Sequence, residues 1–366
     1  MTNRAEAVIN LSAIKSNVAT LKAKAGVDLM AVVKADAYGH GLVPVAKAAL
    51  DGGATWLGVA LLEEAIALRS AGITAPILAW LVPPGSDFQS AVDKDIDLAV
   101  SSIKALDEIR LLKGSKRPRI HLEVDTGMTR GGFLSEWSEI DRDHLQGVEI
   151  VGIFSHFARA DEPGQAQNLE QVNRFKKMVA NLDSFGFTNL IRHLSNSAAT
   201  LVDHGSAFDM VRTGIALYGL TPDLNHLGTS QSLGLKPAMT LRAKLHLVKA
   251  VPAGSPVGYG ATEKTKSDTT LGVVAMGYAD GIPRIAKGAG VFFNGKRAPI
   301  IGRVSMDQFV VDLGAESTAQ SGDWVTIFST GTNGEYTADD WGVASGTINY
   351  EIVTRIGPRV PRIYEL

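Results

Sequence analysis

Between residues 27 and 212, eight short apolar runs alternate with longer amphipathic stretches, and this alternation limits the fold more than any other feature of the sequence. The runs are rich in Val, Ile and Leu and often lack strict alternation, which is typical of strands buried on both faces. Repeated strand–helix units predict a parallel sheet, and eight strands predict an α/β fold closed into a (β/α)8 barrel of the TIM type. The runs are Val27–Val33, Trp56–Ala60, Pro76–Trp80, Asp97–Val100, Arg119–Val124, Glu149–Ser155, Ile191–Leu194 and Phe208–Arg212.

Three stretches beside these runs have apolar residues at helical spacing. The first covers about 11–24, with Asn10 as the expected N-cap. A doubly wound open sheet is the alternative architecture, but no glycine-rich dinucleotide fingerprint follows the first strand. The other two helical stretches are 61–72, with Leu61, Ala65 and Leu68 on one face, and 168–186, with Leu169, Val172, Phe175, Val179 and Leu182.

The pattern changes after about Leu235. Four β-like segments follow, separated by Gly, Pro and Asn-Gly turns, and Asn294-Gly295 predicts a hairpin. We therefore expect a barrel domain over 1–235 and a mostly β domain over 236–366, and the first ten or so residues could pack with the second domain. The four segments are 241–248, 271–277, 290–304 and 323–328.

Composition excludes several functional classes. The formal net charge is -2, so no basic field favours nucleic acid. The chain has no cysteine, which excludes disulfides and cysteine nucleophiles, and its eight histidines lack the helical spacing of a metal site. No window approaches the roughly 18 apolar residues of a membrane span, and no signal peptide is recognisable. We expect a soluble, cytoplasmic protein without a metal centre.

Lys34 stands directly after the first apolar run. The polar segment that follows it, 35–41, contains two glycines and Tyr38 and predicts a turn. Active sites in barrels lie at the C-terminal ends of the strands. A lysine there either extends its apolar stem over the barrel mouth with its charge in water, or forms an ion pair, or provides a desolvated, reactive amine. Lys34 alone does not decide between these interpretations.

Polar side chains follow most of the other runs as well. Asn196-Ser197 begins an expected helix after the seventh run, and Gly214-Ile215 follows the eighth. Helix N-termini offer backbone N–H groups to an anion, and phosphate sites recur after strands 7 and 8 of this fold. A phosphate site combined with a strand-end lysine suggests pyridoxal phosphate. The other polar or aromatic residues at strand ends are Trp80, Glu123, Asp125, Arg130, His156 and Arg212.

Nine short motifs cover essentially the whole chain, and in this order they are very specific. They are VVKADAYGHG, DTGMTRGGF, FSHFARAD, HLSNSAA, VRTGIALYG, VGYGAT, GYADGIPR, RVSMDQ and INYEI. With these motifs the chain closely resembles the alanine racemase family, pyridoxal-phosphate enzymes built from a barrel and a β domain. The resemblance implies pyridoxal 5'-phosphate as the cofactor, alanine as the substrate and a homodimer with shared active sites.

The resemblance also implies roles for individual residues. Lys34 matches the lysine that carries the cofactor and acts as one base, and Tyr259 matches the opposite base, supplied by the partner subunit. Arg212 matches the arginine that faces the pyridine nitrogen, with His156 behind it. The positions near the cofactor phosphate are Tyr38, Asn196, Ser197, Gly214, Ile215 and Tyr350, and Trp80 matches a residue beside the cofactor.

On the substrate side, Arg130 and Met306-Asp307 match groups near the substrate carboxylate, and Tyr278 matches a gate at the entrance. Many family members carry a carbamylated lysine where this chain has Glu123. We expect Glu123 to supply the same negative charge and to hold Arg130 directly or through a water molecule or ion.

Interconversion of L- and D-alanine is therefore the expected activity, supplying D-alanine for bacterial cell-wall peptidoglycan. Another amino-acid racemase of the same fold and a non-catalytic carrier of pyridoxal phosphate are the alternatives. A carrier would need only the barrel, whereas Tyr259 lies in the second domain. A D-threonine aldolase or D-serine dehydratase would be expected to need a C-terminal metal constellation, and the sequence offers none.

Overall fold

The computed structural model describes residues 3–202 and 205–366, and in it the chain divides into two compact units. One unit contains a parallel sheet and most of the helices, and the other contains mainly antiparallel strands. The first unit comprises Ile14–Ala37 and Leu42–Leu235. The second comprises Met1–Ala13, Tyr38–Gly41 and Lys236–Leu366.

The parallel sheet has eight strands in the order β8-β7-β6-β5-β4-β3-β2-β9. Most are short apolar runs with largely buried side chains, as expected for strands covered by helices outside and by packed side chains within, whereas β8 buries only its last residue. The strands are β2 Asp28–Val32, β3 Trp56–Val59, β4 Ile77–Ala79, β5 Asp97–Val100, β6 Arg119–Glu123, β7 Glu149–Phe154, β8 Ile191–His193 and β9 Met210–Thr213.

The two ends of this sheet meet, so the sheet is a nearly closed barrel. β9 pairs in parallel with β2, where Met30 lies opposite Arg212. Between β8 and β9 two backbone bonds bridge the remaining gap, from Asp209 to the carbonyl of Arg192 (3.0 Å) and from Arg212 to that of Ser195 (2.9 Å). The predicted barrel is confirmed, and the open doubly wound sheet is wrong.

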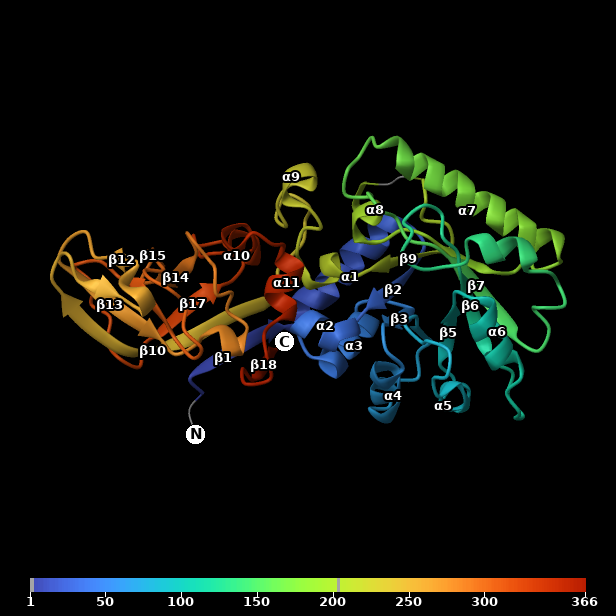
Figure 1. The fold of residues 1–366 in the computed structure, drawn as a ribbon, viewed down its shortest axis with the longest axis horizontal. Coiled ribbons are helices and arrows are strands. Elements are labelled where there is room, and N and C mark those ends of the chain that lie inside the picture. The colour runs from blue at the N-terminus through green and yellow to red at the C-terminus, as the bar shows by residue number, and fades with distance from the viewer. Residues whose placement is uncertain (1–2, 203–204) are drawn as a thin grey trace. The chain divides into compact units, whose positions relative to one another are not determined.

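Helices surround the barrel strands (Figure 1). All three helical stretches expected from spacing are helices, and the Asn10 side chain caps the first by accepting a hydrogen bond from the Ala13 backbone (2.8 Å). The helices are α1 Leu11–Ala25, α3 Leu42–Asp51, α4 Leu62–Ser70, α5 Phe88–Asp93, α6 Ile103–Arg110, α7 Ala166–Ser184, α8 Ser197–Val202 and α9 Leu224–Leu227.

Two leucines assigned to buried helix faces are exposed instead. Leu61 precedes the first turn of α4 in extended conformation and is 42% exposed, so only Ala65 and Leu68 of the predicted face are buried. Leu169 is 65% exposed. At 3.6 residues per turn it lies roughly a third of a turn from the centre of the buried face of α7, where Asn168 takes its place.

The second unit is mostly strands, as predicted. Its longest strand, β10 Met239–Val251, pairs antiparallel with β1 Ala5–Asn10, β13 Thr269–Val274 and β17 Trp324–Phe328. Asn294 and Gly295 both have positive φ (44° and 80°) in the two-residue hairpin predicted there. The other elements are β11 Pro256–Val257, β12 Glu263–Lys264, β14 Gly290–Phe293, β15 Lys296–Pro299, β16 Phe309–Asp312, β18 Arg362–Glu365, α10 Ala338–Ser345 and α11 Asn349–Thr354.

The segment after β2 is one turn of left-handed helix, α2 Lys34–Gly39, and not the simple turn that its glycines predict. The four residues Ala35–Tyr38 all have φ between 52° and 54°, and the Ala37 backbone N–H donates to the carbonyl of Val33 (2.9 Å). A left-handed conformation costs a non-glycine residue about 1–2 kcal/mol. Side-chain contacts must therefore hold this turn.

Two carboxylates do so. The Glu64 side chain accepts hydrogen bonds from the backbone of Ala35 (2.5 Å) and from that of Leu61 (3.0 Å). The Asp36 side chain accepts one from the backbone of Leu42 (2.8 Å), where α3 begins. The backbone on both sides of Ala35–Tyr38 is thereby fixed, and Lys34 occupies the first position of the turn.

This handedness predicts opposite effects for two alanine-to-glycine substitutions. Ala35→Gly removes the left-handed penalty and should raise the free energy of unfolding by about 1 kcal/mol. Ala23→Gly, at an equally exposed alanine in right-handed α1, should lower it by about 1 kcal/mol. Denaturant unfolding of both variants measures the difference, and a loss of stability in both would contradict the left-handed turn.

Candidate active site

The predicted residues of the barrel unit gather at the C-terminal ends of its strands, because all eight strands are parallel. They come from six different strand ends, so chain segments as far apart in the sequence as Lys34 and Ile215 contribute to one end of the barrel. Lys34 follows β2, Trp80 follows β4, Glu123 ends β6, His156 follows β7, Asn196 and Ser197 follow β8, Arg212 lies in β9, and Gly214 and Ile215 follow it.

Lys34 has the environment of a reactive amine. Its Nζ lies 5.9 Å from the centroid of the Trp80 ring. Burial and the positive charge of Arg130 lower the pKa of Lys34 from its ordinary value, while Glu64 acts in the opposite direction. A lysine with a lowered pKa has more of its amine in the neutral form, which can attack a carbonyl carbon or accept a proton.

Arg212 is a buried cation whose terminal nitrogens are fully engaged. Nη1 donates to the carbonyl oxygen (2.7 Å) and Nδ1 (3.1 Å) of His193, and Nη2 donates to the carbonyl of Ser155 (2.6 Å). The guanidinium carbon lies 5.2 Å from the centroid of the Phe154 ring. Among the described residues, none accepts a hydrogen bond from Nε. Burial lowers the pKa of Arg212 to about 10, so it stays protonated at neutral pH and holds one free N–H donor.

His156, expected behind Arg212, lies with Nδ1 3.3 Å from Nη2 of Arg212. Burial, together with the charges of Arg212, Arg130 and Lys34, lowers the pKa of His156 to about 3. The imidazole is therefore neutral, and it can accept a hydrogen bond from the guanidinium.

His193 also contacts Arg212, and the sequence analysis missed it. It lies inside the apolar run Ile191–Leu194, as His121 lies inside Arg119–Val124. Both side chains are fully buried within the barrel. A histidine within an otherwise apolar strand was the signal that could have identified them.

Glu123 ends β6 and lies near two arginines. Burial raises the pKa of Glu123, against the opposing effect of Arg212 first and Arg130 second. The structure describes both partners and shows no direct ion pair of Glu123 with Arg130, so the direct form of the expected contact is not observed. Arg130 follows a loop closed by Asp125, whose Oδ1 accepts from the backbone of Gly127 (2.8 Å).

The loops after β8 and β9 meet at Ser197. Its Oγ accepts hydrogen bonds from the backbone of Gly214 (2.9 Å) and of Ala216 (3.4 Å). Asn196 caps α8, accepting from the backbone of Ala199 (3.0 Å). The predicted phosphate-side residues of the barrel unit are thus brought together, with Gly214 and Ile215 buried at the start of the 3-10 helix η2 Ile215–Tyr218.

The other predicted residues belong to the second unit. Tyr38 and Tyr350 have ring centroids 6.3 Å apart, and burial raises the pKa of Tyr38 to about 12. Tyr259 begins η3 Tyr259–Ala261 and is 71% exposed.

Tyr278 and Met306 lie on two segments of that unit joined by backbone bonds. Tyr278 donates to the carbonyl of Ser305 (3.1 Å) and Ala279 to that of Met306 (2.9 Å). Asp307 accepts a hydrogen bond from Arg359 (2.7 Å). The Tyr278 and Met306 side chains are exposed.

Within residues 3–202 and 205–366, no cluster of three or more His, Asp or Glu side chains could hold a metal ion. Nor does any helix in these ranges have the length and apolar character needed to cross a membrane.

Comparison with known proteins agrees with this architecture. The family model for the alanine racemase N-terminal domain matches residues 9–222, and that for the alanine racemase C-terminal domain matches residues 238–364. The chain is 49% identical to an alanine racemase of Salinispora arenicola, covering 99% of this chain and 98% of the relative. It is 48% identical to an alanine racemase of Thermobifida fusca, covering 100% of this chain and 99% of that relative.

Solved structures are similar over the same length. The crystal structure of alanine racemase from D-cycloserine-producing Streptomyces lavendulae has a TM-score of 0.97 and 48% identity, covering 100% of this chain and 98% of that one. The enzyme from Bacillus anthracis, solved with bound L-Ala-P, has a TM-score of 0.89 and 39% identity, covering 100% and 96%.

The low pKa of His156 predicts a dependence of stability on pH. Its folded pKa, about 3, is below the ordinary value of 6.5, so below pH 6.5 the unfolded chain binds a proton that the folded chain does not. As the pH is lowered from about 6.5 to about 3, the free energy of unfolding therefore decreases, by up to about 1.4 kcal/mol per pH unit.

The variant His156→Gln should lose this contribution. Between pH 7.5 and pH 5.5 its free energy of unfolding should fall by about 1.4 kcal/mol less than that of the wild type, measured by denaturant titration. Exposed His246, changed to Gln in the same way, is the control. Equal pH dependence of the wild type and His156→Gln would contradict the prediction.

Proposed function

The chain belongs to the alanine racemase family, and from this premise we propose that it interconverts L- and D-alanine with pyridoxal 5'-phosphate bound by Lys34. Members of the family are isomerases, and the matched relatives are similar over the whole chain. The observation that carries the proposal is the combination of two groups at one end of the barrel. These are the Lys34 amine, with its lowered pKa, and the buried Arg212 guanidinium with one free N–H.

These residues fit the cofactor. Lys34 offers an amine for its carbonyl carbon, and Nε of Arg212 offers a donor for its ring nitrogen. Arginine does not give up its proton, so it would leave that nitrogen unprotonated. When bound, pyridoxal phosphate acidifies the Cα–H bond of an amino acid by withdrawing electrons. The proposed phosphate-side residues are Tyr38, Asn196, Ser197, Gly214, Ile215 and Tyr350, with Trp80 beside the ring.

Racemisation requires the Cα proton to leave one face and a proton to return to the other. We assign Lys34 to one face and Tyr259 of a second subunit to the other, so the substrate does not have to rotate in the site between the two proton transfers. Burial and Arg130 favour the neutral amine of Lys34, which is the form that accepts a proton. The exposure of Tyr259, 71%, is compatible with a role across a subunit interface.

The remaining assignments concern the substrate and the physiological role. Arg130 and the segment Met306-Asp307 would lie near the alanine carboxylate, and Tyr278 would line the entrance. The product D-alanine would serve bacterial cell-wall peptidoglycan, and the protein would act in the cytoplasm as a homodimer.

Chemical trapping tests the role of Lys34. Borohydride reduction of the holoenzyme should abolish its visible absorbance band, and peptide mapping should find the modification on Lys34. Lys34→Ala should remove both the band and the interconversion of L- and D-alanine measured by chiral chromatography. Lys47→Ala, at an exposed lysine in α3, is the control. A band and no racemisation of any amino acid would indicate a carrier, and faster turnover of another amino acid would indicate a different racemase.

Exchange of the α-proton in D2O tests the second base. Tyr259→Phe should slow racemisation by about 10²–10⁴-fold, because one face has lost its base. Lys34 should still exchange the α-proton of one enantiomer with solvent, which mass spectrometry of recovered alanine detects. Equal exchange of both enantiomers by Tyr259→Phe would overturn the assignment.

A further inference from the structure

The interior of the barrel contains a line of polar side chains below Arg212, where packed apolar layers are usual. His121 of β6 and His193 of β8 have no exposed surface, and Asp97 of β5 is 1% exposed. Burying polar groups in such a core is costly unless each one finds a partner. The line therefore needs an explanation beyond packing.

The side chains connect in sequence. Nη1 of Arg212 lies 3.1 Å from Nδ1 of His193, and Nε2 of His193 lies 2.9 Å from Nδ1 of His121. Nε2 of His121 then lies 3.4 Å from Oδ2 of Asp97, where the two atoms are in electrostatic contact but lack the geometry of a hydrogen bond. The line begins near the C-terminal end of β9, at Arg212. It ends at Asp97, the first residue of β5, and therefore at the N-terminal end of that strand.

The position of every proton along this line follows from Arg212. A guanidinium can only donate, so Nδ1 of His193 must accept, and in neutral His193 the proton is on Nε2. Nε2 of His193 then donates to Nδ1 of His121, which places the proton of His121 on Nε2, facing Asp97. Burial lowers the pKa of both histidines, in agreement with neutral rings.

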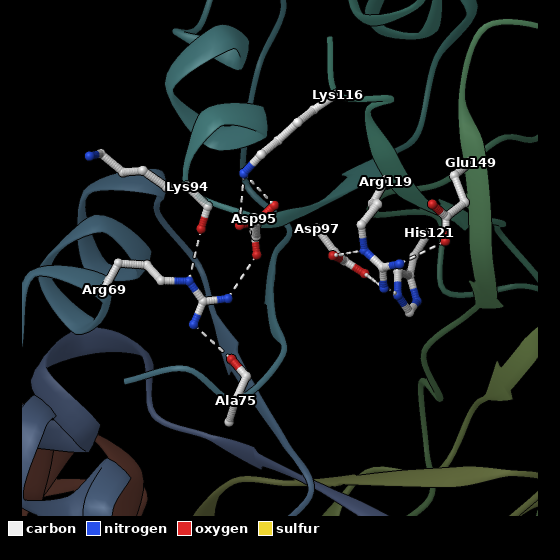
Figure 2. A network of polar contacts seen from close by, with 9 residues as sticks. All are labelled: Arg69, Ala75, Lys94, Asp95, Asp97, Lys116, Arg119, His121 and Glu149. Carbon is white, nitrogen blue, oxygen red and sulfur yellow. Dashed lines mark hydrogen bonds and ion pairs between the residues drawn. The ribbon is translucent and has the colours of Figure 1, made fainter. Parts of the chain in front are cut away.

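Asp97 is fixed at the far end of the line. Arg119 donates to it from Nε (2.9 Å) and Nη2 (3.1 Å), and donates from Nη1 to the partly exposed Glu149 (2.7 Å) (Figure 2). Burial opposes the charge of Asp97, but contacts with His121 and Arg119 hold its pKa below the ordinary value. A carboxylate therefore faces His121 at neutral pH.

Packing fixes the two imidazole rings as well. The ring of His193 is stacked on Phe154, with centroids 5.0 Å apart and planes 15° apart, and Trp56 meets His121 edge-on at 5.3 Å. Gly152 of β7 makes room for His121, since a Cβ there would lie 2.6 Å from Nδ1 of that ring. Neither ring can turn without disturbing the core.

We propose that Asp97, His121 and His193 are positioning residues for Arg212. The negative charge of the carboxylate favours the Nε2–H tautomer of His121, His121 selects that of His193, and His193 holds Nη1 so that Nε remains free for the cofactor ring. The last step rests on the proposed function, whereas the tautomers do not depend on it.

Nitrogen NMR of the ¹⁵N-histidine-labelled holoenzyme tests the tautomers directly. The chain has eight histidines, so the signals can be assigned with single His→Gln variants. Between pH 6 and 9 His121 and His193 should both be neutral with the proton on Nε2. A proton on Nδ1 of either ring, or a charged ring, would overturn the proposal, and this measurement needs no folded variant of Asp97.

A matched pair of variants tests the dependence on Asp97. In Asp97→Asn the side chain is neutral and has one oxygen in place of two, so the tautomer signals of His121 and His193 should change. The kcat for alanine should fall about tenfold or more, with KM within about twofold. Asp95→Asn, near it in sequence but paired with Lys116 outside the line, should change neither (Figure 2).

Unchanged tautomers and unchanged kcat in Asp97→Asn would overturn the proposal. An altered tautomer of His121 or His193 in Asp95→Asn would also overturn the proposal, because it would show that removing any nearby negative charge has this effect. If the wild type does not racemise alanine, the tautomer signals still decide whether the line exists, so the failure of this inference and of the proposed function are distinguishable.

Discussion

The buried guanidinium of Arg212 is the interaction on which the rest of this structure depends. Removing a charge from water costs several kcal/mol unless hydrogen bonds replace the lost hydration. Here the replacements include carbonyl groups at the ends of β7 and β8, those of Ser155, His193 and Leu194. Because β8 and β9 share only a few backbone bonds, the same side chain also helps to close the barrel. The same hydrogen bonds of Arg212 therefore close the barrel between β8 and β9 and keep a positive charge at the site.

A second constraint acts on Lys34. Its amine is reactive only if it is partly desolvated and held in place, and the left-handed turn that begins at this residue is intrinsically unfavourable. The turn persists because Glu64 binds the backbone of Ala35, and because Asp36 of the turn binds the backbone of Leu42 at the start of α3. Strained backbone that is held by its surroundings is concentrated at functional sites in proteins. The rigidity of Lys34 thus comes from α4 and from the start of α3 more than from the turn itself.

The architecture could be predicted from sequence because strands buried on both faces leave continuous apolar runs. The handedness of the turn could not be, since none of Ala35–Tyr38 is a glycine and the carboxylate of Glu64 lies almost 30 residues further on. The errors at Leu61 and Leu169 have a similar origin, because spacing alone does not show where a helix begins or where its buried face is centred. His121 and His193 were overlooked because they occupy strand positions, where side chains are usually apolar.

The role of each site residue came from the resemblance to a family, whereas the contacts among them came from the structure. Spacing alone left Lys34 undecided between a solvated charge, an ion pair and a reactive amine. Only the environment of that amine, with burial and Arg130 both lowering its pKa, gives a physical reason for the reactive amine.

The order of the two units along the chain has a consequence for experiments that recombine related genes. The strand-rich unit is assembled from three separate segments, one of which is the four-residue stretch Tyr38–Gly41 inside the barrel sequence. In addition, β1 pairs with both β10 and β18, which come more than 200 residues later. A chimera with a single junction near residue 235 would therefore combine segments of different parentage within one sheet. Exchanging this unit cleanly requires four junctions, after Ala13, Ala37, Gly41 and Leu235, because the gene does not contain the unit as one block.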